Sequence, residues 1–283
     1  MKIAQLLLAG APEYERKSQR VDFAALAAMH EVILLHDPAA VVRGSGARVA
    51  HVYGPPELPR APFVGFPIPY IASGDLPRRR FALRRPAEPE YVVTPLRDGP
   101  GELLPEAVEE EYFDLKAAAE PPHSKVVGSF RRSGLDNIVQ QTIARIARFR
   151  DDMIWHVHER PPTPSDLAGV DVWVDPALRE DDFDGFVAEA MVAGRVVVAS
   201  RTAINVQRTE KGRTGFLVPQ NDPNELTHAI LAAIFKPEVA HSKMEAARQT
   251  LSKFRPRQRL RVLAHMYETL SGDERSAKPI ATL

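Results

Sequence analysis

The spacing of apolar residues in the second half of the chain predicts a strand, a helix and a second strand in succession. Val172 to Val174 is a short apolar run, and Arg195 to Ala199 is mostly β-branched, as in a strand covered on both faces. Between these runs, one face of a short helix is formed by residues three or four positions apart, namely Phe186, Ala190 and Ala193.

A glycine and an acidic loop complete this pattern. Gly194 stands where the helix must end, and glycine enters the left-handed conformation of a helix C-cap without strain. Strand, acidic loop, helix, glycine and strand together predict a βαβ unit. Ligands of such sheets bind at the carboxyl ends of the strands, which is where the loop from Arg179 to Gly185 falls.

Apolar runs elsewhere predict the remaining elements. In the first part of the chain the predicted strands are residues 2–9, 30–35 and 48–54, with 63–72 and 91–94 as further candidates and one short helix at 23–28. In the second part, strands are predicted at 125–128 and 153–157, and helices are predicted from residue 136 onwards and at 226–234, 244–251 and 258–270. Helices are scarce among the early strands, so the first domain is predicted to be a reduced one.

Composition excludes several classes of protein. The chain has 283 residues, of which 44% are hydrophobic and 26% charged, which is typical of a globular protein large enough for two domains. Lys+Arg and Asp+Glu both number 37, so no excess of charge attracts nucleic acid, and none is expected as a partner. The absence of cysteine excludes disulfides and thiolate metal sites and fits a reducing cytoplasm. No apolar run approaches the ~18 residues of a membrane span.

Two blocks of sequence resemble a known family. Residues 189–200 read Glu-Ala-Met-Val-Ala-Gly-Arg-Val-Val-Val-Ala-Ser, and residues 211–219 read Lys-Gly-Arg-Thr-Gly-Phe-Leu-Val-Pro. They resemble the donor-binding segment of the retaining GT-B glycosyltransferases of group 1 (family-4-like). The preceding part of the family pattern differs, because Asp181 stands in place of a glutamate and Asp182-Phe183-Asp184 in place of Gly-Phe-Gly.

The resemblance implies an α/β protein of GT-B type, with two Rossmann-type domains facing a cleft. The N-terminal, acceptor-side domain is expected at residues 1–118 and is reduced in size. The nucleotide-sugar-binding domain is expected at 119–255. Residues 256–283 are expected to form a terminal helix that crosses back to the first domain, followed by a tail.

The resemblance also implies roles for the acidic residues of the second domain. Glu189 is expected to contact the ribose of the donor, and Asp181 the transferred sugar, with Asp182, Asp184 and Gly185 beside it. The alternative for Glu189 is a solvent-exposed helix carboxylate. For the three Asp residues the alternative is an acidic loop that the helix macrodipole favours.

The diphosphate of the donor requires cations. Family members place an Arg and a Lys in the pattern Gly-Arg-x-x-x-x-Lys-Gly, whereas this chain has Gly128, then Ser129 and Ser133 at those positions in a shorter loop. Arg131 and Arg132 lie nearby and are the candidates for this charge. The alternative is that both are exposed loop residues.

Histidines and a basic loop are further candidates. His51 stands at a strand end where members of the family often have a histidine that lines the cleft, so the resemblance implies a contact with the sugar, unless His51 is structural. His156 and His158 share a strand face at a spacing that can bind metal, but no third ligand is close in sequence, so no resident metal site is predicted. The arginines between Arg78 and Arg85 form a basic loop, either solvated or facing a phosphorylated acceptor.

The resemblance implies a transferase that moves a sugar from a nucleotide-diphosphate sugar to a glycan or lipid-linked acceptor in polysaccharide or glycoconjugate synthesis. No prosthetic group is expected, although the Asp residues are able to hold a divalent cation. The expected location is the cytoplasm, free or peripherally bound to the inner face of the membrane. The competing hypothesis is an inactive GT-B module that binds a nucleotide sugar or a partner glycosyltransferase.

Overall fold

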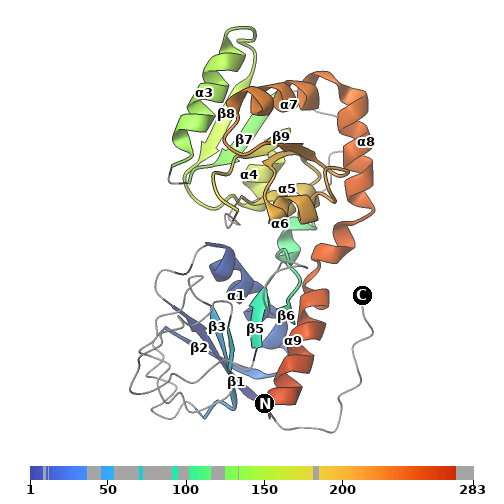
Figure 1. Cartoon of the computed structure of the whole chain (residues 1–283). Helices are drawn as coiled ribbons and strands as arrows, with labels where there is room; N and C mark the ends of the chain where they lie inside the picture. Colours follow the sequence, from blue (N-terminus) through green and yellow to red (C-terminus); the bar gives the residue numbers. More distant parts are fainter. Residues whose placement is uncertain are drawn as a thin grey trace. The chain divides into compact units, whose positions relative to one another are not determined.

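The computed structural model describes residues 1–8, 11, 13–36, 46–53, 70–72, 91–94, 102–115, 125–132, 134–180 and 185–271. Contacts divide the chain into two units, which Figure 1 draws in sequence colours. The first unit comprises Met1–Ala107 together with Pro256–Leu283, and the second comprises Val108–Arg255. The predicted boundary after residue 118 falls among residues outside the described part of the chain. Val108 belongs to the second unit because it is fully buried in the core of that unit.

The first unit is built on a six-stranded parallel sheet with the order β2-β1-β3-β4-β5-β6. The strands are β1 (Lys2–Leu7), β2 (Glu31–Leu35), β3 (Val49–Tyr53), β4 (Tyr70–Ala72), β5 (Tyr91–Thr94) and β6 (Glu102–Leu103). The strands predicted from the early apolar runs are confirmed, although residues 63–69 of one candidate lie outside the described residues. Because β2 and β3 flank β1, the chain reverses direction across the sheet and creates a topological switch point between β1 and β3.

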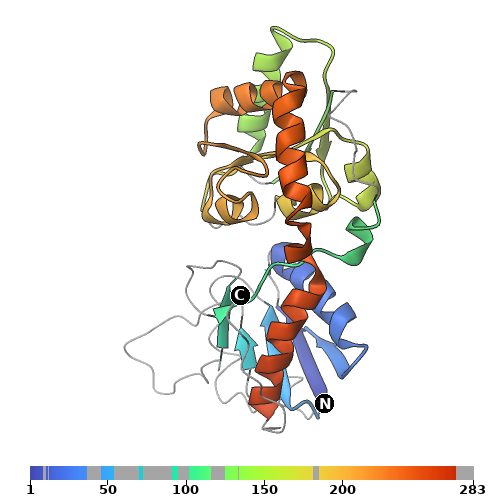
Figure 2. The same cartoon turned by 90° about the vertical axis from the view of Figure 1, so that its right-hand side faces the viewer.

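Two helices of the first unit bury different kinds of surface. α9 (Pro256–Ser271) lies along this unit in both views, and its Leu263 and Tyr267 pack with Ile3 of β1 (Figure 1 and Figure 2). α1 (Glu13–Leu26) begins ten residues before the predicted helix at 23–28. The prediction was too short because α1 buries polar residues, among them Lys17 and Asp22, and therefore lacks an apolar stripe in its first turns.

A buried ion pair joins these two helices. Arg259 of α9 donates to both carboxylate oxygens of Asp22 on α1, at 2.6 and 2.9 Å, and to the carbonyl oxygen of Pro105 at 3.2 Å. The side chains of the pair are 4% and 2% exposed. Tyr53, at the end of β3, donates a third hydrogen bond to Asp22 at 2.7 Å. The carboxylate is therefore fully paired although it is out of solvent.

His51 extends this network into the sheet. Its side chain is fully buried, its ring stacks on that of Tyr53 at 4.1 Å between centroids, and its Nδ1 lies 2.9 Å from the hydroxyl of Tyr267. Burial lowers the pKa of His51 to about 3, because the charged imidazolium would lose its hydration; Asp22 opposes this shift and Arg259 adds to it. The imidazole is therefore neutral at physiological pH.

The second unit is built on a five-stranded parallel sheet with the order β11-β10-β9-β7-β8. The strands are β7 (Val126–Phe130), β8 (Ile154–His158), β9 (Val172–Asp175), β10 (Val196–Ser200) and β11 (Phe216–Val218). The predicted βαβ unit is confirmed as β9, α5 (Val187–Val192) and β10. Gly194 has φ +72°, the left-handed conformation expected where that helix ends.

Helices cover both faces of this second sheet. They are α3 (Asp136–Ala147), α4 (Pro164–Ala168), α6 (Ala203–Arg208), α7 (Pro223–Phe235) and α8 (Pro237–Arg248), with short 3-10 helices η2 (Glu110–Tyr112) and η3 (Leu251–Phe254). On one face, Ile138 of α3 and Ile230 of α7 pack against Val127. On the other, Leu167 of α4 and Met191 of α5 share a cluster with Trp173. The sequence missed α4 and α6, which are too short for a periodic pattern, although Thr163 and Thr202 cap them.

Trp173 of β9 is the largest fully buried side chain of the second unit and requires a glycine beside it. It is the register partner of Gly128 on β7. A Cβ on Gly128 would lie 2.8 Å from Cγ1 of Val170 and 2.9 Å from Cε3 of Trp173, closer than real Cβ contacts. No helix among the described residues is both long and apolar enough to cross a lipid bilayer.

The first prediction concerns Gly128. Replacing Gly128 with Ala adds a methyl group that pushes the side chains of Trp173 and Val170 away from β7. Overpacking of this kind typically lowers the free energy of unfolding by ~1–3 kcal/mol. Gly169→Ala is the matched control, because its Cβ would meet the carbonyl oxygens of Asp166 and Ser165 at 3.5 and 3.9 Å, which is ordinary van der Waals contact. Urea denaturation of both variants checks this; equal stability of the two would show that the indole ring is not confined.

The second prediction concerns the pH dependence that His51 imposes. The pKa of His51 is about 3 in the folded chain and 6.5 ordinarily, so its contribution to stability is complete above pH 6.5 and is lost as the pH falls. Between pH 6.5 and ~5 this loss reaches ~2 kcal/mol. We expect His51→Asn to flatten the dependence in that window, whereas His228→Asn, which changes an exposed histidine, leaves it as in the wild type. Urea midpoints across this pH range measure it, and identical slopes for His51→Asn and the wild type would contradict a neutral, buried His51.

Candidate functional site

The topology of the second sheet indicates where a ligand binds. From β7 the chain goes to β8 on one side and then to β9 on the other, so the switch point lies between β7 and β9. The helices that follow these strands, α3 and α5, lie on opposite faces of the sheet. Ligands of open α/β sheets bind outside the carboxyl ends of the strands at such a point.

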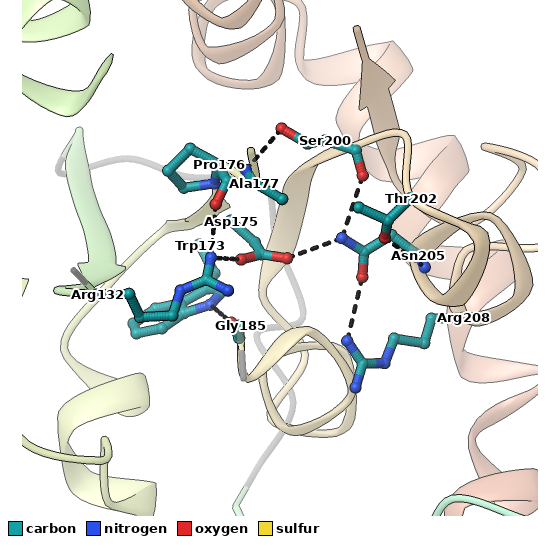
Figure 3. A network of polar contacts seen from close by, with 10 residues as sticks. All are labelled: Arg132, Trp173, Asp175, Pro176, Ala177, Gly185, Ser200, Thr202, Asn205 and Arg208. Atoms are coloured by element: carbon teal, nitrogen blue, oxygen red, sulfur yellow. Dashed lines mark hydrogen bonds and ion pairs between the residues drawn. The ribbon is translucent and has the colours of Figure 1, made fainter. Parts of the chain in front are cut away.

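An ion pair lies at this switch point. Arg132, two residues after β7, donates to the carboxylate of Asp175, the last residue of β9 (Figure 3). The side chain of Arg132 is 10% exposed and that of Asp175 is 0% exposed. The same guanidinium nitrogen donates to the carbonyl oxygen of Pro176 at 2.5 Å.

Asparagine and arginine side chains of α6 continue the network. Asn205 Nδ2 donates to Asp175 Oδ2 at 2.8 Å and to the carbonyl oxygen of Ser200 at 3.1 Å. Arg208 Nη1 donates to Asn205 Oδ1 at 3.1 Å. The hydroxyl of Ser200 in turn accepts the backbone N–H of Ala177 at 2.9 Å, so the ends of β9 and β10 are joined (Figure 3).

Gly185, on the loop that precedes α5, lies against the side chain of Asp175 at the end of β9. A Cβ on Gly185 would lie only 2.1 Å from Cγ of Asp175, so this position has no room for any side chain. Its carbonyl oxygen accepts the indole N–H of Trp173 at 2.7 Å. Gly185, predicted to bind the donor, is thus held in place by two side chains of β9.

Phe186 shows how tightly the start of α5 is held. It has φ +54°, a left-handed conformation that is strained for a bulky residue. Its buried ring packs edge-to-face on that of Phe130 at 5.0 Å between centroids, which fixes it in place. Glu189 follows in the first turn of α5.

The side chain of Glu189 is fully buried at the start of α5. The alternative reading, a solvent-exposed helix carboxylate, is therefore wrong. Glu189 lies in the first turn of the helix that follows β9, at the carboxyl edge of the sheet, which is the part of such folds where ligands bind. Its proposed contact with ribose stays a prediction.

The predicted diphosphate ligands have diverse environments. Arg132 is not an exposed loop residue, because it is engaged with Asp175. Arg131 is an exposed loop residue, as the alternative expects, and it pairs with Glu159 at 2.6 Å and Asp136 at 3.2 Å. Gly128 lies inside β7, and Trp173 fills the space beside it, so its lack of a side chain is explained by packing.

Several predicted site residues lie outside the described residues. They are Asp181, Asp182, Asp184, Ser133 and the basic residues between Arg78 and Arg85. Within the described ranges no group of three or more His, Asp or Glu side chains is placed to hold a metal ion. His156 and His158 lie on the same face of β8, 6.4 Å apart between ring centroids.

His51 belongs to the first unit, where it is fully buried in the network with Tyr53 and Tyr267. The structure therefore supports the structural reading of His51, and the catalytic reading stays untested.

Sequence reasoning missed the residue at the centre of the second unit's network. The apolar run from Val172 to Val174 predicts a strand that stops just before Asp175, and no role is predicted for Asp175. The signal that marks it is an acidic residue at the carboxyl end of a fully buried parallel strand, a position at which functional side chains gather. Its partner Arg132 lies 43 residues away in sequence, a pairing that no local pattern reveals.

Comparisons with known proteins agree with this fold. Residues 116–235 match the family model of the group 1 glycosyl transferases. Among solved structures, HepE of Anabaena aligns with a TM-score of 0.66 at 14% identity, covering 95% of this chain and 100% of that chain. Sucrose-phosphate synthase of Thermosynechococcus elongatus aligns with a TM-score of 0.67 at 13% identity, covering 97% and 100%.

A glycosyltransferase of Rickettsia africae aligns with a TM-score of 0.65 at 14% identity, covering 97% of this chain and 99% of that one. No curated protein matches the chain in sequence. At identities this low, the structural likeness shows the fold, and the family model identifies the domain. The chain therefore has the GT-B fold of two Rossmann-type α/β units, and its residues 116–235 are similar to the group 1 glycosyl transferases.

Proposed function

We propose that the chain is a glycosyltransferase that moves a sugar from a nucleotide-diphosphate sugar to an acceptor, with retention of configuration. The observation that carries the proposal is the group 1 domain, whose Glu-Ala-Met block the fold places at the carboxyl edge of the second sheet. That edge is where a doubly wound sheet binds its ligand.

The proposed donor is a uridine-diphosphate sugar, with other bases as alternatives. HepE, which shares the fold, has been solved with UDP, with UDP and glucose, and with UDP-glucose. We assign the ribose contact to Glu189, since a carboxylate accepts hydrogen bonds from vicinal hydroxyl groups. We assign the transferred sugar to the segment Asp181, Asp182, Asp184 and Gly185, which leads into α5.

The leaving diphosphate needs compensation of its charge. Arg131 and Arg132 follow β7 at the switch point and are the proposed source of that charge. Gly128 precedes these arginines on β7 and is proposed as a further donor-binding residue through its backbone, although the packing of Trp173 against it already explains its lack of a side chain.

The proposed acceptor is a glycan or a lipid-linked glycan, as in polysaccharide or glycoconjugate synthesis. A related structure, TarM of S. aureus, was solved with Fondaparinux, α-GlcNAc-glycerol and UDP. The proposed location is the cytoplasm, either free or peripherally bound at the inner face of the membrane, where lipid-linked acceptors are available.

The third prediction tests the donor site. We expect a thermal-shift panel of UDP, GDP and ADP to raise the unfolding midpoint with at least one nucleotide, because a ligand of the folded state stabilises it. Glu189→Gln removes charge-assisted hydrogen bonds worth ~1.5–3 kcal/mol, so we expect binding about tenfold to a hundredfold weaker. The matched control is Glu225→Gln, which makes the same change in the first turn of α7, where the side chain is exposed. Unchanged affinity of Glu189→Gln would show that the ribose lies elsewhere.

The fourth prediction tests turnover. The segment where relatives have glutamate and glycines carries three carboxylates here, those of Asp181, Asp182 and Asp184. Their negative charge repels the negative charge of the diphosphate. We therefore expect donor hydrolysis to be slow, or to be accelerated by Mg²⁺ or Mn²⁺ and suppressed by EDTA. Hydrolysis of UDP-, GDP- and ADP-sugars with and without metal measures this. Fast turnover insensitive to EDTA would contradict the charge argument, and nucleotide binding without any turnover would identify an inactive nucleotide-sugar-binding module.

A further inference from the structure

The cation best placed for a diphosphate already has an anionic partner in the protein. Arg132 lies at the switch point between β7 and β9, and its guanidinium donates to the carboxylate of Asp175 and to the carbonyl oxygen of Pro176 (Figure 3). In this conformation its charge is therefore neutralised by the chain itself. Any phosphate that approaches this edge meets a carboxylate beside the arginine.

Asp175 is firmly held in that position. Oδ2 accepts from Asn205 at 2.8 Å, and the carboxyl group lies so close to Gly185 that no Cβ fits there. Because Asn205 also donates to the carbonyl oxygen of Ser200 and accepts from Arg208, its amide is fixed in orientation. The carboxylate therefore stays at the end of β9, whereas Arg132, on the loop after β7, is the partner able to move.

The ion pair of Arg132 and Asp175 is not explained by a gain in stability. A buried ion pair rarely adds stability over an uncharged pair of similar shape, since the loss of hydration offsets the attraction. Its cost is repaid in specificity or regulation in some proteins. Here the pair lies at the one edge of the sheet where topology predicts a ligand, which points to a role in binding.

We propose that Asp175 is an internal competitor of the donor diphosphate, which holds Arg132 in a closed contact and lowers the affinity of the site for phosphates. This inference rests on the proposed function, because it assumes that a nucleotide binds at the carboxyl edge of the second sheet. Binding of the diphosphate breaks the contact between Arg132 and Asp175 and transfers the guanidinium to the phosphate oxygens. The carboxylate then remains with Asn205.

The test is a double-mutant cycle read by calorimetric titration. The proteins are the wild type, Asp175→Asn, Arg132→Gln and the double variant, and the probes are UDP, GDP and ADP with their nucleosides. Asp171→Asn is the matched control: it removes the same charge at the opposite end of β9, where Asp171 accepts the N–H of Val126 at 2.8 Å. Thermal unfolding without ligand shows whether each variant is folded.

A unit charge a few ångströms from a phosphate changes affinity by more than about tenfold at an intermediate dielectric. We expect Asp175→Asn to bind the diphosphate at least about tenfold more tightly than the wild type, and the nucleoside within about twofold. Asp171→Asn should leave both unchanged. The double variant should bind the diphosphate about as the wild type does, because in the wild type the two charges already cancel.

Two results would overturn the inference while leaving the proposed function standing. One is a folded Asp175→Asn protein whose diphosphate affinity is no higher than that of the wild type. The other, which decides the matter even where Asp175→Asn fails to fold, is a double variant that binds the diphosphate at least about tenfold more weakly than the wild type, because Arg132 would then already serve the phosphates. If neither the wild type nor any variant binds a nucleoside or nucleotide, the proposed function fails and the inference with it.

Discussion

The second unit depends on the close packing of two side chains of β9 against glycines on neighbouring segments. Trp173 and Asp175 lie two positions apart on β9 and therefore point to the same face of the sheet. Trp173 fills the space beside Gly128 on β7, and Asp175 fills the space over Gly185 before α5. The side chains of β9 therefore leave room only for glycine at both positions. The indole N–H also bonds to the carbonyl oxygen of Gly185, so one residue anchors the sheet core and the loop that leads to Glu189.

This arrangement ties the rigid interior of the sheet to the edge at which a ligand binds. A change in the packing around Trp173 shifts Gly185, and Gly185 contacts the carboxylate that pairs with Arg132. Side chains at a binding site are held accurately when residues behind them are locked by packing and hydrogen bonds. In this unit the same strand supplies the packing residue and the charged residue, so little freedom separates them.

Much of this fold could be predicted from the sequence, because buried parallel strands form apolar runs that need no knowledge of their partners. The βαβ unit of β9, α5 and β10 and the cap at Gly194 followed from local spacing alone. The extent of α1 could not be predicted, because its buried face carries Lys17 and Asp22. Their charges are paired by Glu106 and Arg259, which lie far away in sequence. The ion pair of Arg132 and Asp175 escaped for the same reason. Resemblance located Glu189, but only the fold showed that its carboxylate is buried.

Each unit buries an arginine–aspartate pair, and the difference between the two pairs bears on their roles. In the first unit Asp22 and Arg259 both lie on helices, both side chains are almost fully buried, and Tyr53 completes the coordination of the carboxylate. Neither partner can leave without stranding a charge, so that pair is structural. In the second unit Asp175 ends a strand, but Arg132 lies on a loop and keeps some exposure. Its guanidinium can therefore exchange the carboxylate for another anion without first crossing the core, and a pair of this kind is suited to respond to a ligand.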